Sequence, residues 1–208
     1  MRVLIVNSIV DLLTHYLNVW TDNLVKNCKQ DNNYIRLKDK RATKKHFNSV
    51  MKKQNIKLVL LNGHGSSSAV FGVEQKAVVD SDNVSHLDQT VTHALACSSA
   101  KELGLKAIQH GALSYIGYDE EFVACLKDGR ISDPLKDDTA SLFLNPAFTV
   151  PKALLNGKSP DEAVKLAKKE YNRSIIKALN SDIQSDNDQF VSLLLWDREH
   201  LKNLQPGS

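Results

Sequence analysis

The chain has 208 residues, of which 42% are hydrophobic and 25% charged, a composition typical of a soluble globular protein with a sizeable core. No linker-like stretch divides it, so we expect one domain spanning residues 1–208. The net charge of +3 is small and the basic residues are scattered, which argues against nucleic acid as a partner.

The N-terminal residues and the cysteines indicate the cellular compartment. The apolar run at residues 2–6 is too short for a signal peptide, and no small-x-small cleavage site follows it. No window approaches the roughly 18 apolar residues that span a membrane. The three cysteines, Cys28, Cys97 and Cys125, are widely spaced, which argues against a disulfide framework or a zinc ribbon. We therefore expect a cytoplasmic protein with reduced thiols and no membrane partner.

Short apolar runs predict the strands of a parallel sheet. Four of them are continuous rather than alternating, which is typical of strands buried on both faces. They cover residues 2–7, 58–61, 90–96 and 112–118. A shorter and more polar run at residues 34–37 is typical of an edge strand.

Amphipathic helical patterns fall between these runs. They cover residues 11–27, 43–54 and 98–109, and the last pattern ends before Gly111. Strands and helices that alternate at these intervals predict βαβ units with right-handed crossovers. The fold class is therefore α/β, with an open, mostly parallel sheet and helices on both faces.

Two later stretches depart from this alternation. Residues 71–79 have strand composition with a polar middle, which predicts a small β-hairpin outside the main sheet. Residues 121–138 are polar and loop-like, and the chain then looks helical to its end. A helix start is predicted at Ser159, as N-cap, with Pro160 in the first helical position. For a sixth strand, this helical tail offers only residues 191–196.

Reactive side chains follow two of the buried strands, at the edge where open parallel sheets bind ligands. His64 lies between Gly63 and Gly65, and Cys97 lies where a strand gives way to a predicted helix. A thiol at a helix N-terminus has a lowered pKa, and an imidazole on the neighbouring strand end can exchange its proton. The N–H groups of Gly65 and Cys97 can together form an oxyanion hole. The sequence thus predicts an acyl-transfer site with Cys97 as nucleophile and His64 as general acid/base.

Other interpretations of these residues bear on the prediction. A buried cysteine is more often an inert small hydrophobe, but a histidine and a cysteine at two strand ends of one sheet favour function. His93 is too far from Cys97 to pair with it, because four residues of strand span about 13 Å. The same distance rules out a zinc site built from His64, His93 and Cys97, and we predict no metal or cofactor. Cys28 and Cys125 are expected to be structural.

An apolar strand ending in His-Gly, followed by one ending in Ala-Cys, resembles the caspase-like cysteine peptidases, which include caspases, gingipains, clostripain, separase and bacterial CHAT proteases. Residues 107–118 (AIQHGALSYIGY) resemble the Gly-Ala turn and strand of CHAT and gingipain domains. Residues 148–171 resemble the CHAT signature, in which one helix ends at Leu-x-Gly and the next begins Ser-x-x-Glu-Ala. The resemblance covers about residues 56–179 and is closest to the CHAT and gingipain-like branch. It implies a caspase-like fold and a cysteine endopeptidase with His64 and Cys97 as its dyad.

The chain departs from true caspases next to the nucleophile. Leu95 stands where caspases carry the Gln of Gln-Ala-Cys, so specificity for aspartate is not expected. Relatives that cut after lysine or arginine use a buried acid in the first specificity pocket. Asp119, Glu120 and Glu121 follow a strand end next to the site, although such acids are equally typical of a solvated loop. We therefore predict cleavage after basic residues, with Asp119 and Glu120 as candidate substrate-binding residues.

The resemblance also bears on partners and regulation. It implies a protein or peptide substrate, and activation by a partner protein, by a ligand such as calcium or by ordering of a loop. Relatives often carry a self-cleaved loop where residues 121–138 lie, and Lys127, Arg130 and Lys136 are candidate positions for such a cut. Two alternatives remain open: a catalytically silent caspase-like protein-interaction module, and a small-molecule thiol hydrolase or acyltransferase that uses the same dyad.

Overall fold

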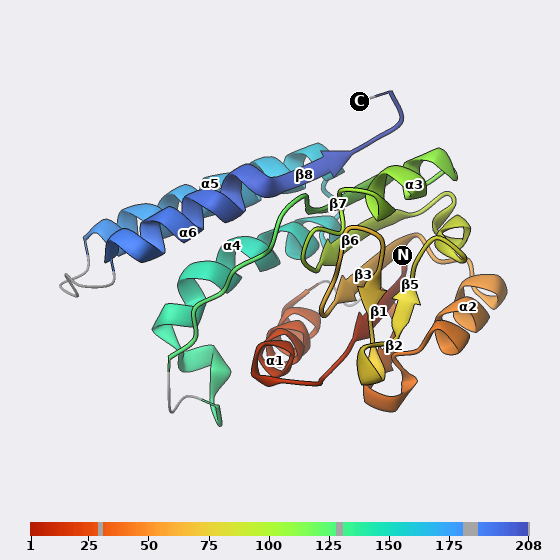
Figure 1. The fold of residues 1–208 in the computed structure, drawn as a ribbon, viewed down its shortest axis with the longest axis horizontal. Helices are drawn as coiled ribbons and strands as arrows, with labels where there is room; N and C mark the ends of the chain where they lie inside the picture. Colours follow the sequence, from red (N-terminus) through yellow and green to blue (C-terminus); the bar gives the residue numbers. More distant parts are fainter. Residues whose placement is uncertain (29–30, 128–130, 181–186, 208) are drawn as a thin grey trace.

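The computed structural model describes the chain apart from residues 29–30, 128–130, 181–186 and 208. A six-stranded sheet with the order β2-β1-β3-β6-β7-β8 forms its centre (Figure 1). The strands are β1 (Arg2–Asn7), β2 (Asn33–Lys38), β3 (Leu58–Asn62), β6 (Val91–Leu95), β7 (Ser114–Tyr118) and β8 (Leu201–Leu204). Neighbouring strands are parallel except β7 and β8, which are antiparallel. The protein is therefore α/β with an open, mostly parallel sheet, as the sequence predicts.

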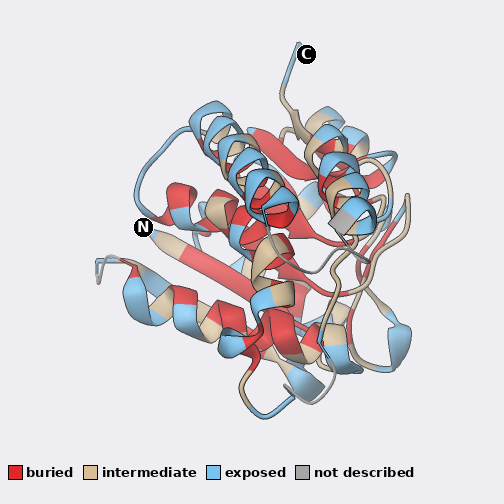
Figure 2. Ribbon diagram, turned by 90° about the vertical axis from the view of Figure 1, so that its left-hand side faces the viewer, coloured by how far each residue is buried: buried red, intermediate tan, exposed pale blue. Residues whose placement is uncertain are grey.

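Helices cover both faces of this sheet. One face carries α1 (Leu12–Asn27), α4 (Asp138–Leu155), α5 (Pro160–Leu179) and α6 (Asn187–His200), and the other carries α2 (Lys44–Lys53) and α3 (Leu103–Gln109). Short 3-10 turns lie at Asp39–Arg41, Val73–Gln75, Val84–Leu87 and Pro134–Lys136. Figure 2 shows the buried residues concentrated in the strands and on the inward sides of the helices.

Each face of the sheet has its own hydrophobic core, because side chains alternate along a strand. In β3, Leu58 and Leu60 belong to the core under α1, α4, α5 and α6, whereas Val59 and Leu61 belong to the core under α2 and α3. All four side chains are almost fully buried. This explains why the central strands read as continuous apolar runs.

The helix start predicted at Ser159 is confirmed. The Ser159 side chain accepts a hydrogen bond from the Glu162 N–H, and the Glu162 carboxylate accepts one from the Ser159 N–H. Gly157, with a φ of +82°, follows the end of α4 in the left-handed conformation that favours glycine. Two helices thus meet at the Leu-x-Gly and Ser-x-x-Glu segments.

The predicted hairpin is also confirmed. β4 (Val70–Phe71) and β5 (Ala77–Val79) form a separate antiparallel two-stranded sheet. It packs on the core under α2 and α3 through Val70, Val78 and Val79. In the described ranges, no helix is both long and apolar enough to cross a membrane.

The prediction that the tail is helical to its end is wrong. Residues 191–196, offered as the sixth strand, lie inside α6, and the sixth strand is β8 at the end of the chain. β8 pairs antiparallel with β7, and Asn203 accepts a hydrogen bond from the Ser114 hydroxyl. Pairing with the exposed edge of β7 decides the conformation of this short segment, which has little strand signal of its own.

The prediction of a helix from residue 98 is wrong as well, because α3 begins only at Leu103. Ser98 has a φ of +55°, which a right-handed helix does not adopt. The Ser98 N–H donates to the carbonyl of Glu120, and the Ala100 N–H donates to that of Tyr118. These bonds to the end of β7 and to the segment after it hold residues 98–102 as turns.

Candidate active site

The site lies at the carboxyl ends of three adjacent parallel strands, β1, β3 and β6. The chain passes from β1 to β2 on one side and then to β3 on the other, so the strand order reverses between β1 and β3. Such a reversal is where open α/β sheets bind their ligands. Asp11 follows β1, His64 follows β3 and Cys97 follows β6. Three neighbouring strand ends therefore each supply one side chain with acid, base or nucleophile chemistry.

The strand register places His64 and Cys97 at the same level. Asn62 is paired with Leu95, and His64 and Cys97 each lie two residues beyond that pair. The Gly63 N–H donates to the Leu95 carbonyl at 3.3 Å, which extends the ladder beyond the strand ends. Neighbouring strands lie about 4.8 Å apart, so the backbones of the two predicted residues are adjacent.

Gly65 lies close to the backbone of the nucleophile. A Cβ atom at Gly65 would lie 2.6 Å from the carbonyl oxygen of Cys97 and 3.1 Å from its backbone nitrogen. Only glycine fits without displacing one of the two strand ends. The two N–H groups predicted to form the oxyanion hole therefore belong to segments in direct contact.

Asp11 interacts directly with His64. The Nε2 atom of His64 lies 2.5 Å from Oδ2 of Asp11, and both side chains are partly exposed. Asp11 is also the N-cap of α1, because its Oδ1 accepts hydrogen bonds from the backbone N–H and the hydroxyl of Thr14. Burial opposes ionisation of Asp11, but the hydrogen bonds from Thr14 and His64 outweigh it and lower the pKa of the carboxyl. An ionised carboxylate thus holds Nε2 of His64 and leaves Nδ1 for another partner.

The sequence reasoning missed Asp11. A signal for it was present, because Asp11 and Thr14 form a capping box at the start of the first helix. That helix follows the first strand, so its N-cap lies at the same sheet edge as His64 and Cys97.

Cys97 is partly buried, and its thiol donates to the carbonyl oxygen of Phe122 at a distance of 3.8 Å. Burial raises the pKa of the thiol, the nearby carboxylates of Glu121 and Asp197 also raise it, and the Phe122 bond only partly opposes them. The prediction of a thiol pKa lowered by a helix N-terminus is therefore wrong, because α3 begins six residues beyond Cys97. At rest Cys97 is a thiol, and it needs a base to become a thiolate.

Residues 120–123, named here the strap, lie over Cys97. The Ser98 N–H donates to the Glu120 carbonyl at 2.8 Å at one end of the strap. At the other end the Trp196 indole N–H donates to the Glu121 carbonyl at 2.9 Å, and the Val123 N–H donates to Asp197 at 3.0 Å. The strap is thus tied both to the nucleophile's own turn and to α6.

Asp197, which sequence reasoning did not single out, is buried near the site. Its side chain is fully buried, and its Oδ2 has no hydrogen-bond partner within the described parts of the chain. Burial raises its pKa to about 8, despite the hydrogen bond from Val123. No local pattern marks this residue, because it lies in a late helix that only the tertiary fold brings to the strand ends.

The two candidate substrate-binding acids both have side-chain partners. Asp119 lies 2.7 Å from His200 and 3.4 Å from Lys202, and Glu120 lies 2.7 Å from Lys101. The carboxylates that influence the thiol of Cys97 are instead those of Glu121 and Asp197.

The remaining predicted residues have simpler surroundings. His93 is fully buried, and burial lowers its pKa to about 3, so it is a neutral core residue rather than a partner of Cys97. Lys136 pairs with Asp133, whereas Arg130 lies outside the described residues. No cluster of three or more histidine, cysteine or acidic side chains in the described structure could hold a metal ion.

A hollow of about 350 Å³ opens beside His64, lined by Asp11, His64, Gly65, Phe71 and Gln75. A carboxylate, an imidazole, a thiol and a glycine with close backbone approach are the groups that acyl transfer requires.

No protein-family model matches this chain, and no curated protein matches it.

Proposed function

We propose that this protein is a caspase-like cysteine endopeptidase, of the kind that its sequence resembles. Cys97 is the nucleophile, His64 the general acid/base and Asp11 the residue that orients His64. The observation that carries the proposal is the placement of these residues at the ends of three adjacent parallel strands, with His64 Nε2 2.5 Å from Asp11. We also propose a cytoplasmic location, because three widely spaced cysteines argue against a disulfide framework.

In the first half of the reaction, Nδ1 of His64 takes the proton of the Cys97 thiol as sulfur attacks the peptide carbonyl carbon. The carbonyl electrons move to oxygen, and the N–H groups of Gly65 and Cys97 stabilise this oxyanion. The C–N bond then breaks, and the leaving amine takes the proton from His64. The product is a thioester on Cys97.

In the second half, His64 takes a proton from water, which attacks the thioester carbonyl. The C–S bond breaks, the acid product leaves, and His64 returns the proton to the sulfur. Asp11 stabilises the imidazolium in both halves, as the carboxylate does in other nucleophile–histidine–acid sites.

Cleavage after a basic residue is the specificity that the charges favour. Besides burial, the carboxylate of Glu121 raises the pKa of Cys97, so a negative charge acts on the proposed nucleophile. A lysine or arginine side chain bound beside Cys97 would offset that charge. Equal turnover of peptides with neutral and basic residues before the cleaved bond would contradict this specificity.

The test compares wild type with Cys97→Ala and His64→Ala on a mixed library of peptides that carry a fluorogenic leaving group, with and without calcium. We expect each variant to lose turnover by about 10³-fold or more. Cys125→Ala, which removes the other partly buried thiol, should keep full turnover and serves as the control.

Because the strap lies over Cys97, we expect the enzyme to be latent. If the wild type shows no turnover, a second assay is therefore needed. A peptide-based electrophile that alkylates Cys97 but not Cys28 or Cys125 would indicate a latent peptidase. A Cys97 that stays inert even to a small alkylating agent would favour an interaction module. Turnover of thioesters without peptides would favour a small-molecule hydrolase.

A further inference from the structure

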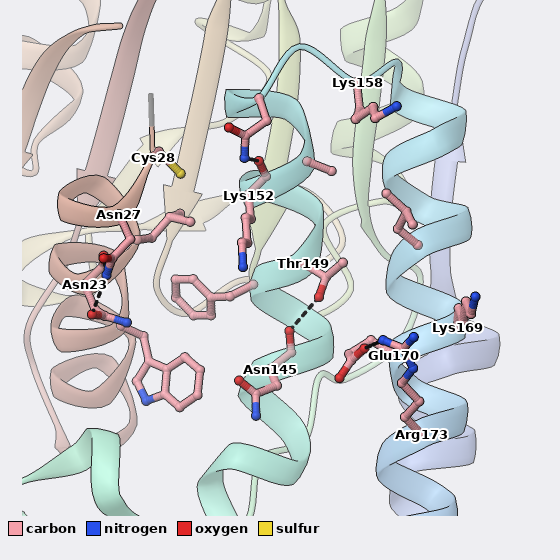
Figure 3. A pocket seen from close by; sticks show the side chains of 16 residues that line it. Asn23, Asn27, Cys28, Asn145, Thr149, Lys152, Lys158, Lys169, Glu170 and Arg173 are labelled. Atoms are coloured by element: carbon pink, nitrogen blue, oxygen red, sulfur yellow. Dashed lines mark hydrogen bonds and ion pairs between the residues drawn. The ribbon is translucent and has the colours of Figure 1, made fainter. Parts of the chain in front are cut away.

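A second cavity of the described structure is a groove on another part of the molecule. It has a volume of about 810 Å³, and it runs between α1, α4 and α5, as Figure 3 shows with α4 in the middle. None of its lining residues lines the hollow beside His64. On α1 the lining begins at Trp20, well away from Asp11 at the start of that helix. The groove is therefore separate from the proposed active site.

The lining residues follow helical spacing on all three helices. α4 contributes one continuous face: Asn145, Phe148, Thr149, Lys152, Ala153 and Asn156. α1 contributes the same spacing from Trp20 to Cys28, and α5 from Leu166 to Arg173. The face of α4 is about 16 Å long at 1.5 Å per residue, which matches a bound helix of about two to three turns. Side chains with this spacing form ridges and grooves on a helix surface, against which another helix can pack.

Part of the floor of the groove is apolar. Trp20 and Phe148 pack together with their ring centroids 5.7 Å apart. Leu166 on the α5 side is 41% exposed, although it is a large hydrophobic side chain. An occupant with an apolar stripe would cover this leucine and the accessible edges of the floor.

The charged side chains that line the groove are mostly basic. Its charged lining residues are Lys152, Lys158, Lys169, Glu170 and Arg173, so four cations accompany one carboxylate. Arg173 pairs with Glu170, and Lys158 pairs with Glu162. Lys152 and Lys169 form no ion pair with any carboxylate in the described parts of the chain. Two cations are thus left to pair with an acidic ligand.

We propose that this groove binds a short amphipathic acidic helix of a partner protein. The apolar stripe of that helix packs on α4 between α1 and α5, and its acidic residues pair with Lys152 and Lys169. This is the helix-in-groove mode of recognition, with charge complementarity between the acidic residues of the bound helix and the two lysines. The proposal does not depend on the peptidase activity, because only binding is involved.

The probe is a fluorescein-labelled helical peptide of about three turns, with leucines on one stripe and glutamates beside it. Fluorescence anisotropy measures its binding to wild type and to the double variant Lys152→Glu/Lys169→Glu. We expect wild type to bind and the double variant to bind roughly tenfold or more weakly. The matched control is Lys165→Glu/Lys177→Glu, which reverses two exposed lysines of α5 outside the groove and should bind as wild type does.

Two further peptides distinguish a shaped groove from simple charge attraction. A scrambled peptide of the same composition, without the leucine stripe, and a peptide with lysine in place of glutamate should both bind much more weakly. Leu166→Asp should weaken binding of the striped acidic peptide without unfolding the protein, because this side chain is exposed.

Equal binding of the scrambled peptide, equal loss in the control variant or no binding by wild type would overturn the proposal. Self-association of the chain abolished by Lys152→Glu/Lys169→Glu would also overturn it, in favour of a second copy as occupant.

Discussion

Asp11 shows how one side chain can serve folding and chemistry at the same time. One of its oxygens accepts the hydrogen bonds that begin α1, and the other lies against His64. The cap positions the carboxylate, so the imidazole receives a partner whose place is set by the backbone. The two roles can be separated, because asparagine caps helices about as well as aspartate but carries no charge.

We therefore expect Asp11→Asn to fold with little change in melting temperature and to lose peptidase turnover by about 100-fold. The loss follows because an amide does not stabilise the imidazolium of His64 as a carboxylate does. Measuring kcat/KM beside thermal unfolding checks both parts. Asp22→Asn, which removes an acid on the same helix that pairs with Arg36, is the control and should keep its turnover. Undiminished turnover in Asp11→Asn would show that Asp11 only caps the helix.

Gly65 makes a second prediction at the scale of a residue. In Gly65→Ala the new Cβ would meet the Cys97 carbonyl oxygen at 2.6 Å and the Ala96 Cβ at 2.9 Å, so the two strand ends must separate. A displacement of about 1 Å at reacting groups can cost roughly 100-fold in rate, and we expect a loss of kcat/KM of that size. Ser68→Ala, in the same loop, should be nearly neutral. A Gly65→Ala protein with full turnover would contradict the proposed oxyanion hole.

At the scale of elements, the strap lies over Cys97, the proposed nucleophile, and is bound by α6. Phe122 of the strap is buried, its ring centroid lies 5.0 Å from that of Tyr118, and its carbonyl accepts the thiol hydrogen bond. Trp196 and Asp197 of α6 bind the strap on either side of Phe122. Release of these contacts is therefore the step that would expose Cys97.

Trp196→Phe tests this connection between α6 and the thiol. Phenylalanine keeps an aromatic ring beside His200 but loses the hydrogen bond to the Glu121 carbonyl. A net hydrogen bond contributes about 0.5–1.5 kcal/mol, so we expect Cys97 to react with iodoacetamide about two- to tenfold faster. Mass spectrometry of the alkylated chain gives the rate at Cys97 alone. Leu195→Ala, an exposed neighbour, should leave the rate unchanged, and equal rates in Trp196→Phe and wild type would mean that the strap does not gate the thiol.

At the scale of the whole molecule, two buried ionisable groups set the pH dependence of stability. His93 has its pKa lowered to about 3, so the unfolded chain binds a proton that the folded chain does not, and stability rises with pH until the ordinary histidine pKa of about 6.5. Asp197 has its pKa raised to about 8, so the folded chain holds a proton that the unfolded chain has lost above its ordinary pKa of 3.8. This contribution falls as the pH rises towards 8.

Between about pH 4 and 6.5 the two contributions oppose each other and nearly cancel, so we expect a plateau of stability there and a decrease between pH 6.5 and about 8, on the order of 1 kcal/mol or more. Asp197→Asn should remove the decrease on the alkaline side and turn the plateau into a rise with pH up to about 6.5, which is the contribution of His93 alone. Urea unfolding at a series of pH values measures both limbs. Asp188→Asn, on the exposed part of the same helix, should follow the wild-type curve. An unchanged alkaline limb in Asp197→Asn would show that Asp197 is not the responsible group.

The parts of the fold that depend on local pattern were predictable from the sequence. Continuous apolar runs marked β1, β3, β6 and β7, because strands covered by helices on both faces need apolar side chains on both. The start of α5 was marked by Ser159 and Pro160, whose effect is confined to the first helical turn. The order of strands and helices then gave the α/β class, and with it the sheet edge where His64 and Cys97 lie.

Other features were decided by contacts between distant parts of the chain. β8 exists because β7 offers an unpaired edge, and α3 starts late because Ser98 and Ala100 bond to the end of β7 and the segment after it. The partner of His64 is the N-cap of the first helix, the strap reaches Cys97 from the segment after β7, and Asp197 comes from the last helix. The sequence by itself determined which strands and helices form and which reactive residues follow the strands, because those features depend on neighbours in the chain. Only the tertiary structure decided that the thiol is covered and protonated and that Asp11 completes the site, because burial and charge act through space rather than along the chain.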